Sequence, residues 1–422
     1  MYTAPFHDRL KDYVNKGRAR FFTPGHKGVL QDIDLTELDD TDNLFAPGEA
    51  LTKARRQAAA YFGACQTLFS AGGNTLCIQT MLKMAHKGGN MLFHRHIHAS
   101  AVHTAALLGI TPLWLYEHIL SPDTVEKELR AHTVDAVYIT SPDYYGQLQD
   151  ITGLSAVCRK HNVPLLVDNA HGSHLVPFGL HPLTLGAGAT ACSAHKTLPV
   201  LTGGAFLNVG EFFAGESENL LSHMKLFAST SPNFTTLASL DTCIKWLYEE
   251  GNSLLLQTAE KVTRLREFAH NAKIPLLDGP DIDPLRLTLC IDGAAAKQHF
   301  HKNRVEPELC DSGHAVFLCS PFNNNWDFEY LYDAIETLPA SCPKPPPLVI
   351  PPCETVMTPR EAMLAVNTEY AGITPALVGK IAAESPFVCP PGRPLIVAGE
   401  RITKEVIENA KYYSILRIKV VK

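Results

Sequence analysis

Short apolar segments with the character of β-strands alternate with helix-like segments through the middle of this chain of 422 residues. The expected order is strand, helix, strand, helix and strand over residues 113–116, 124–131, 135–140, 154–161 and 164–167. Strands separated by helices run parallel through crossover connections, so this order predicts a doubly wound α/β sheet. Ligands of such sheets bind beyond the carboxyl ends of the strands.

The flanking segments extend the pattern. Upstream we expect a helix, a strand and a helix over residues 51–62, 66–70 and 76–85. Downstream we expect a helical region, a strand and an extended proline-rich connector over residues 209–272, 285–291 and 343–347, with the helical region interrupted at 229–233.

The length of the chain predicts more than one domain, because 422 residues exceed what one core usually covers. We expect an N-terminal segment over residues 1–20 and a large domain with a mainly parallel sheet over residues 21–275. A smaller C-terminal α/β domain is expected over residues 276–422.

A lysine lies between small or polar residues in the stretch Ala191-Cys192-Ser193-Ala194-His195-Lys196-Thr197-Leu198-Pro199. A nucleophilic lysine must lose its proton, and a packed site with small neighbours and a bound cofactor favours the neutral amine. Most lysines are solvated surface charges, so Lys196 alone is weak evidence. Upstream, however, an apolar strand ends in Asp168 and is followed by His171. These three residues are therefore candidates for a site.

A strand, a glycine turn and the start of a helix meet at Ala71-Gly72-Gly73-Asn74-Thr75. The free N–H groups and the positive end of such a helix favour an anion. The turn matches neither Gly-x-Gly-x-x-Gly nor a Walker loop, and glycine turns are commonly structural only. An anion site and a plain turn both remain open.

Histidines alternate in the stretch Phe93-His94-Arg95-His96-Ile97-His98. This spacing could place His94, His96 and His98 on one face of a strand, which suits zinc. No acidic or cysteine ligand is spaced to complete such a site, so no metal is expected. The alternatives are one histidine stacked on a flat ring, or solvated loop histidines.

Charge and composition exclude several classes of partner. A net charge of −6 gives no reason to expect nucleic acid or an anionic membrane. No signal-like start or bilayer-spanning stretch is present, so a cytoplasmic location is expected. The eleven cysteines are scattered, as expected for buried apolar residues in a reducing compartment. Cys192 is notable because it lies close to Lys196.

Four ordered motifs resemble a known family. They are Thr23-Pro24-Gly25-His26-Lys27-Gly28, Ser141-Pro142-Asp143-Tyr144-Tyr145-Gly146, Val167-Asp168-Asn169-Ala170-His171-Gly172 and Ser193-Ala194-His195-Lys196-Thr197-Leu198-Pro199. In this order they resemble the Orn/Lys/Arg decarboxylase family, which contains pyridoxal-phosphate enzymes of the aspartate aminotransferase fold. The likeness extends to Thr230-Ser231-Pro232, Met357-Thr358-Pro359-Arg360-Glu361-Ala362, Pro390-Pro391-Gly392 and Gly399-Glu400. It implies fold type I of the pyridoxal-phosphate-dependent transferases, with a sheet of the seven-stranded type.

The resemblance implies roles for the candidate residues. Lys196 would hold pyridoxal 5′-phosphate as an imine and be displaced by the substrate amine. Asp168 would keep the pyridine nitrogen protonated, so that the ring accepts the electrons left when carbon dioxide departs. His98 would stack on the ring, and His171 would lie near its polar edge.

The resemblance also implies a phosphate site and a dimer. The phosphate would be bound by Gly73, Asn74, Thr75, Ser193 and His195. Thr230 or Ser231 would reach the phosphate of the neighbouring subunit, because such folds form active sites across a dimer interface. We therefore expect a homodimer with its active site at the interface.

This chain departs from the family pattern at two positions. Ala99 stands where the family usually has lysine, and Arg393 stands where an apolar residue is commoner. The larger members also carry an extra N-terminal domain that is not expected here, so their higher assemblies are not expected either. These departures affect substrate choice and assembly rather than cofactor contacts.

The expected function is decarboxylation of a basic amino acid (lysine, arginine or ornithine) to its amine, as in polyamine biosynthesis. An acidic group would recognise the distal nitrogen of the substrate, and Glu306 and Glu308 are candidates for it. An aminotransferase is the first alternative, since it shares Lys196 and Asp168 but needs a keto-acid acceptor. A non-catalytic relative of the same fold and a zinc protein are the others.

Overall fold

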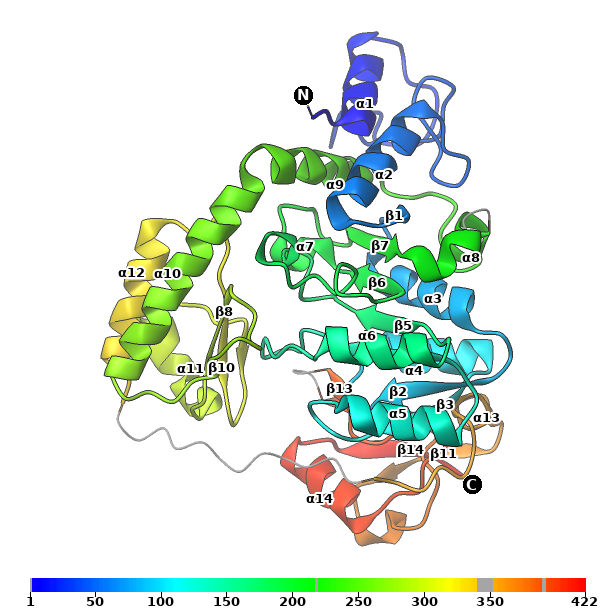
Figure 1. Ribbon diagram of the computed structural model, residues 1–422, viewed down its shortest axis with the longest axis vertical. Helices are drawn as coiled ribbons and strands as arrows, with labels where there is room; N and C mark the ends of the chain where they lie inside the picture. The colour runs from blue at the N-terminus through cyan, green and yellow to red at the C-terminus, as the bar shows by residue number, and fades with distance from the viewer. Residues whose placement is uncertain (1, 217–218, 340–351, 389–391) are drawn as a thin grey trace. The chain divides into compact units, whose positions relative to one another are not determined.

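The computed structural model describes residues 2–216, 219–339, 352–388 and 392–422. The chain forms two compact units, of which the first comprises Met1–Ala85 and Ile151–Leu256 and the second His86–Asp150 and Gln257–Lys422. Figure 1 labels the elements of both units along the chain. The domain boundaries after residues 20 and 275 stay a prediction, and the connector predicted at 343–347 lies outside the described residues.

Four strands form the sheet of the first unit, in the order β1-β7-β6-β5. They are β1 (Gln66–Ser70), β5 (Leu165–Asp168), β6 (Ala189–Cys192) and β7 (Ala205–Val209). β5 and β6 run parallel, whereas β7 is antiparallel to both β1 and β6. Every residue of β5, β6 and β7 is buried, as expected for strands covered on both faces.

The first unit also contains helices and short helical turns. They are α1 (Pro5–Asn15), α2 (Glu49–Phe62), α3 (Gly73–Ala85), α6 (Ile151–Lys160), α7 (Ala194–Thr197), α8 (Leu220–Lys225) and α9 (Phe234–Trp246), with the short turns η1 (Val176–Phe178), η2 (Glu211–Glu216) and η3 (Leu247–Gly251). The polar N-terminal stretch contains α1, which the sequence analysis did not predict. Its first turn is held by Asp241 of α9, whose Oδ2 accepts from the backbone N–H groups of Phe6 and His7 at 2.8 and 3.1 Å.

The second unit begins with three parallel strands in the order β4-β2-β3. These strands are β2 (Asn90–His94), β3 (Thr111–Leu115) and β4 (Val134–Thr140), and the helices between them are α4 (Ala99–Leu108) and α5 (Pro122–Ala131). The alternation that the sequence predicted is therefore present, with most predicted boundaries displaced by one to three residues.

A small antiparallel sheet follows in the second unit, in the order β8-β10-β9. Its strands are β8 (Arg286–Leu289), β9 (Leu309–Cys310) and β10 (Ala315–Leu318), and the helices beside it are α10 (Asn252–Asn271), α11 (Gly293–Lys302) and α12 (Asn325–Glu336) (Figure 1). One apolar core joins these helices to the sheet and includes Val262, Leu287, Phe300, Phe317 and Leu331. β8 and β9 pair with opposite edges of β10.

The C-terminal part of the second unit has its own apolar core, which includes Leu377, Leu395, Val406 and Ile418. Its elements are α13 (Pro359–Met363), β11 (Thr368–Gly372), η4 (Pro375–Leu377), β12 (Phe387–Val388), β13 (Arg393–Pro394), α14 (Lys404–Tyr412) and β14 (Arg417–Val421). Within the parts of the chain that the structure describes, no helix has the length and apolar character to cross a membrane. The α/β class is confirmed.

Candidate active site

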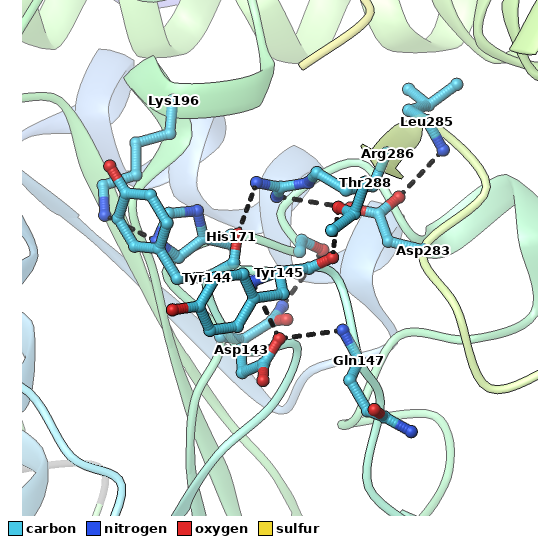
Figure 2. Close-up of polar contacts among 12 residues, drawn as sticks. Asp143, Tyr144, Tyr145, Gln147, His171, Lys196, Asp283, Leu285, Arg286 and Thr288 are labelled. Atoms are coloured by element: carbon cyan, nitrogen blue, oxygen red, sulfur yellow. Dashed lines mark hydrogen bonds and ion pairs between the residues drawn. The ribbon is translucent and has the colours of Figure 1, made fainter. Parts of the chain in front are cut away.

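Lys196 stands in α7, a single helical turn that directly follows β6. Its Nζ lies 3.0 Å from the Nε2 of His171, in the segment after β5 (Figure 2). His171 is buried, whereas Lys196 is exposed. A packed surrounding for Lys196 with the cofactor bound stays a prediction. The imidazole nitrogen of His171 is placed to exchange a proton with the amine.

Asp168 is the last residue of β5 and is only 2% exposed. Its Oδ1 accepts hydrogen bonds from the Nδ2 of Asn74 at 2.9 Å and from the backbone N–H of Ala170 at 3.2 Å. These donors offset part of the cost of burying a carboxylate. Because β5 and β6 are parallel neighbours, Asp168 and α7 both follow strand ends at the same edge of the sheet.

The predicted glycine turn forms the start of α3, which begins at Gly73 rather than at residue 76. Gly73 has a φ of +71°, a left-handed conformation that favours glycine. Its N–H donates to the carbonyl of Gly203 at 2.8 Å, and the side-chain amide of Asn74 is bonded to Asp168. Phosphate binding by Gly73, Asn74 and Thr75 stays a prediction.

Ser193 and His195 flank the start of α7. Ser193 is buried, and its Oγ lies 3.4 Å from the Nδ1 of His195. The backbone N–H of His195 donates to the carbonyl of Gly204 at 3.3 Å. Gly204 cannot be replaced easily, because a Cβ there would lie 2.3 Å from the Cγ1 of Val200. The backbone of the turn that carries Lys196 is thus held by Gly204, the residue directly before β7.

Thr230 and Ser231 are exposed in the loop between α8 and α9. The backbone N–H of Ser231 donates to the Oγ of Ser229 at 3.1 Å, which turns the chain locally. Their contact with the phosphate of a neighbouring subunit stays a prediction.

His98 is the residue that caps α4 in the second unit. Its Nδ1 accepts from the backbone N–H of Ser100 at 3.2 Å and lies 2.8 Å from the Oγ of Ser100, which orients the exposed ring. The stacking of His98 on a cofactor ring stays a prediction.

The zinc alternative required His94, His96 and His98 to act together. His94 instead bonds the carbonyl of Glu117 at 2.9 Å, and its ring stacks on that of His96 with centroids 5.0 Å apart. Burial lowers the pKa of His94 to about 4. Among the residues that the structure describes, no group of three ligand side chains is arranged to hold a metal ion.

Cys192 is fully buried at the end of β6. Burial raises the pKa of its thiol to about 11, although Thr190, Asn169 and Asn208 offer hydrogen bonds that act against this shift. The Nδ2 of Asn169 lies 3.2 Å from its Sγ. The thiol is therefore neutral near pH 7 and has a packing role.

The motif after β4 carries two tyrosines that the sequence analysis did not pair with any residue. We call residues 143–147 the tyrosine loop. The hydroxyl of Tyr144 donates to the Oε1 of Glu308, and that of Tyr145 donates to the Oδ2 of Asp311, both at 2.7 Å. Adjacent tyrosines after a strand were the only signal for these contacts, and they do not reveal distant partners.

The two acidic candidates for substrate recognition differ in their surroundings. Glu308 is bonded to the tyrosine loop, whereas Glu306 pairs with His301 at 3.1 Å and its side chain is 77% exposed. Both residues line a cavity of about 330 Å³ whose apolar side includes Phe317 and Leu331. Recognition of the substrate by either residue stays a prediction.

The comparison with known families is decisive. A family profile described as "Orn/Lys/Arg decarboxylase, major domain" matches residues 28–288. The chain belongs to the Orn/Lys/Arg decarboxylase family. An arginine decarboxylase of Bacillus subtilis is 26% identical over 96% of this chain and 92% of its own length. An uncharacterized protein of the same organism, YaaO, is 27% identical over 96% of this chain and 93% of its own length.

Solved structures of the family share the fold. A lysine decarboxylase from Francisella novicida has a TM-score of 0.83 at 15% identity, over 99% of this chain and 81% of the other. The constitutive lysine decarboxylase of Escherichia coli has a TM-score of 0.80 at 17% identity, over 100% and 82%. The predicted fold type I and membership of this family are thus confirmed, and the chain is an amino-acid decarboxylase whose cofactor is pyridoxal 5′-phosphate.

The residues of the first unit fit this cofactor. Lys196 presents an accessible amine next to an imidazole, as covalent attachment to an aldehyde requires. Asp168 presents a buried carboxylate whose Oδ1 is already oriented by Asn74. The buried Oδ1 of Asn74 has no hydrogen-bond partner among the described residues, so this end of the site retains a polar group for a ligand.

Proposed function

We propose that this enzyme decarboxylates a basic amino acid (lysine, arginine or ornithine) to the corresponding amine. The observation that carries the proposal is the contact between the Nζ of Lys196 and the Nε2 of His171, at the edge of the sheet where the buried Asp168 ends the neighbouring strand β5. The names of the relatives, which are arginine and lysine decarboxylases, support a basic substrate.

Each residue of the first unit has a separate task in this proposal. When bound, pyridoxal phosphate supplies a ring that takes up the electron pair left when carbon dioxide departs. Lys196 holds the cofactor through its amine, and His171 takes or returns the proton of that amine at Nζ. Asp168 keeps a ring nitrogen beside it protonated, because a buried carboxylate favours a positive partner. His98 supplies a flat ring for stacking.

The distal nitrogen of the substrate would be recognised by Glu308. A carboxylate suits a cationic amine or guanidinium, and the bond from Tyr144 leaves Oε2 of Glu308 for that contact. Glu306 is the second candidate, and its pairing with His301 favours it less.

The proposal includes an assembly and a setting. The enzyme would be a cytoplasmic homodimer that contributes to polyamine biosynthesis. Thr230 and Ser231 are exposed, as residues that reach a neighbouring subunit must be before assembly.

The test is an amine-product assay with lysine, arginine and ornithine, with pyridoxal phosphate added and no keto acid. Release of carbon dioxide and one of the three amines supports the proposal. Turnover only after a keto acid is added would identify an aminotransferase. Lys196→Ala is the control, and it should remove both the visible absorbance of the bound cofactor and the product. Cofactor binding by the unchanged enzyme without turnover would indicate a non-catalytic relative.

A further inference from the structure

The carbonyls of the two loop tyrosines each accept a hydrogen bond from a side chain of β8 (Figure 2). The Nη1 of Arg286 donates to Tyr144 at 3.1 Å, and the Oγ1 of Thr288 donates to Tyr145 at 2.8 Å. Arg286 and Thr288 are both 0% exposed, so water does not compete for these bonds. Two buried side chains of one strand therefore hold the backbone of both tyrosines.

Gly146 brings the loop into direct contact with β8. Its φ is +92°, and a Cβ at this position would lie 2.6 Å from the Cγ of Arg286. The carbonyl of Gly146 also accepts from the backbone N–H of Asp283 at 2.8 Å. The loop is thus packed against the start of β8 and cannot move closer to it.

The loop is also closed internally by Asp143. Its Oδ1 accepts from the backbone N–H groups of Tyr145 and Gln147, each at 2.9 Å (Figure 2). These hydrogen bonds hold the tyrosine loop together as a unit. Its position therefore depends on its contacts with other segments of the chain.

One three-stranded sheet holds each tyrosine at both ends. Strand β8 binds the two backbone carbonyls, while the hydroxyls bind Glu308 and Asp311, which flank β9 (Leu309–Cys310). β8 and β9 both pair with β10. A change in the bonds from β8 would therefore shift the Tyr144 hydroxyl relative to Glu308.

We propose that Arg286 and Thr288 are positioning residues that tune which basic amino acids the enzyme accepts, by holding the tyrosine loop against Glu308. The inference rests on the proposed function, in which Glu308 faces the distal nitrogen. The loop follows the carboxyl end of β4, and ligands of parallel α/β sheets bind beyond that end of the strands. In the proposed function Glu308 faces the distal nitrogen, so we expect loss of this contact to alter binding more than the chemistry at Cα.

Thr288→Val is the informative variant, since it removes one donor and keeps the size of the side chain. Thr80→Val is the matched control: Thr80 is also 0% exposed, and its hydroxyl donates to the carbonyl of Leu76 at 2.7 Å. Two measurements are made on the cofactor-loaded enzyme, namely hydrogen exchange of the peptide covering residues 143–149 and steady-state kinetics with the three basic amino acids.

In Thr288→Val we expect faster exchange in the tyrosine loop and a KM for the preferred amino acid raised roughly fivefold, the effect of one lost buried hydrogen bond. The kcat and the visible absorbance of the bound cofactor should stay unchanged, and Thr80→Val should show none of these effects. Arg286→Lys, which retains a charge for Asp283, should raise KM in the same direction.

The proposal would be overturned if Thr288→Val and Thr80→Val had the same KM and the same rate of hydrogen exchange in the tyrosine loop. A lowered kcat for every substrate without a change in KM would overturn it as well, because this result would indicate a general structural role. If the unchanged enzyme releases no amine from any of the three amino acids, the proposed function is wrong. The proposal that Arg286 and Thr288 tune substrate selectivity is then wrong as well. The rate of hydrogen exchange in the tyrosine loop would still decide whether Thr288 positions this loop.

Discussion

The Nζ of Lys196 lies 3.0 Å from the Nε2 of the buried His171. A hydrogen bond between these two atoms requires one of them to donate and the other to accept. A charged ammonium can only donate, so the imidazole then accepts at Nε2. His171 is therefore placed to take the proton that the amine must lose before it reacts.

Replacing His171 by phenylalanine keeps a ring of similar shape and removes the nitrogen. We expect amine release to fall by about 10²- to 10³-fold, the usual contribution of a positioned proton carrier. The bound cofactor should still absorb in the visible range, because Lys196 is present. Full activity in His171→Phe would show that another group carries this proton, and Lys196→Ala serves as the reference for a lost attachment.

Asp168 and Asn74 act together, since the Nδ2 of Asn74 donates to the Oδ1 of Asp168 at 2.9 Å. Asp168→Asn removes the charge but retains the shape, and we expect kcat to fall on the order of 10²-fold because the proposed partner of the ring nitrogen loses its charge. Asn74→Ala removes one bond to a charged group, so a smaller loss of about tenfold is expected. Kinetics at saturating cofactor would check both, and equal losses in the two variants would contradict this order.

Asp241 gives the stability of the enzyme a dependence on pH. Burial raises its pKa to about 7 from an ordinary value of 3.8, although hydrogen bonds from His7 and Phe6 oppose the shift. Below about pH 4 the carboxyl is protonated in both states, and between pH 4 and 7 only the folded state retains the proton. The free energy of unfolding therefore falls as pH rises through this window.

Asp241→Asn removes this dependence and still offers an oxygen acceptor to α1. As pH rises from 4 to 8, the free energy of unfolding of the variant should increase relative to that of the unchanged enzyme by up to about 4 kcal/mol. One pKa unit corresponds to about 1.4 kcal/mol. Denaturant unfolding at pH 4, 6 and 8 measures the effect. The exposed Asp12, changed to asparagine, is the control and should leave the pH profile as it is.

The buried pair of Arg95 and Glu400 joins the end of β2 to the C-terminal part of the second unit. The Nη2 of Arg95 lies 2.9 Å from the Oε2 of Glu400, and both side chains are 1% exposed. Glu400→Ala leaves a buried guanidinium without its carboxylate, so we expect a loss of about 3–5 kcal/mol in the free energy of unfolding. The double variant Arg95→Met, Glu400→Leu should recover much of it.

An exposed pair provides the comparison for that measurement. Glu354 and Arg401 are 2.7 Å apart with side chains 66% and 41% exposed. Glu354→Ala should cost less than about 1 kcal/mol, because exposed pairs contribute little. Denaturant unfolding measures the free energy of unfolding of all the variants. Similar losses of this free energy in Glu354→Ala and Glu400→Ala would show that burial does not determine the contribution of the pair.

Much of the first sheet could be predicted because its strands are short, apolar and separated by helices. The predicted strand at 66–70 matches β1, and that at 164–167 differs from β5 by one residue. Helix α1 was missed although Phe6, Leu10 and Tyr13 recur at helical spacing, and its start depends on Asp241, 235 residues away from Phe6. Strand β7 was not predicted either, and its antiparallel direction follows from pairing with β1 and β6, which its own sequence does not encode.

In the candidate site, too, local motifs could be predicted from the sequence, whereas contacts between distant residues could not. Lys196, Asp168 and His171 could be proposed as site residues because each lies at or shortly after the end of a strand and in a motif typical of the family. The bond from Asn74 to Asp168 spans 94 residues, and that from Tyr144 to Glu308 spans 164. No local pattern predicts contacts over such separations.

By itself the sequence determined the order of strands and helices, the chemical groups at the strand ends and the family, because these depend on neighbouring residues and on motifs. Only the tertiary structure decided that Lys196 is accessible, that Asn74 orients Asp168 and that β8 holds the tyrosine loop. The physical reason is that each of these contacts forms between segments brought together by the packing of the core.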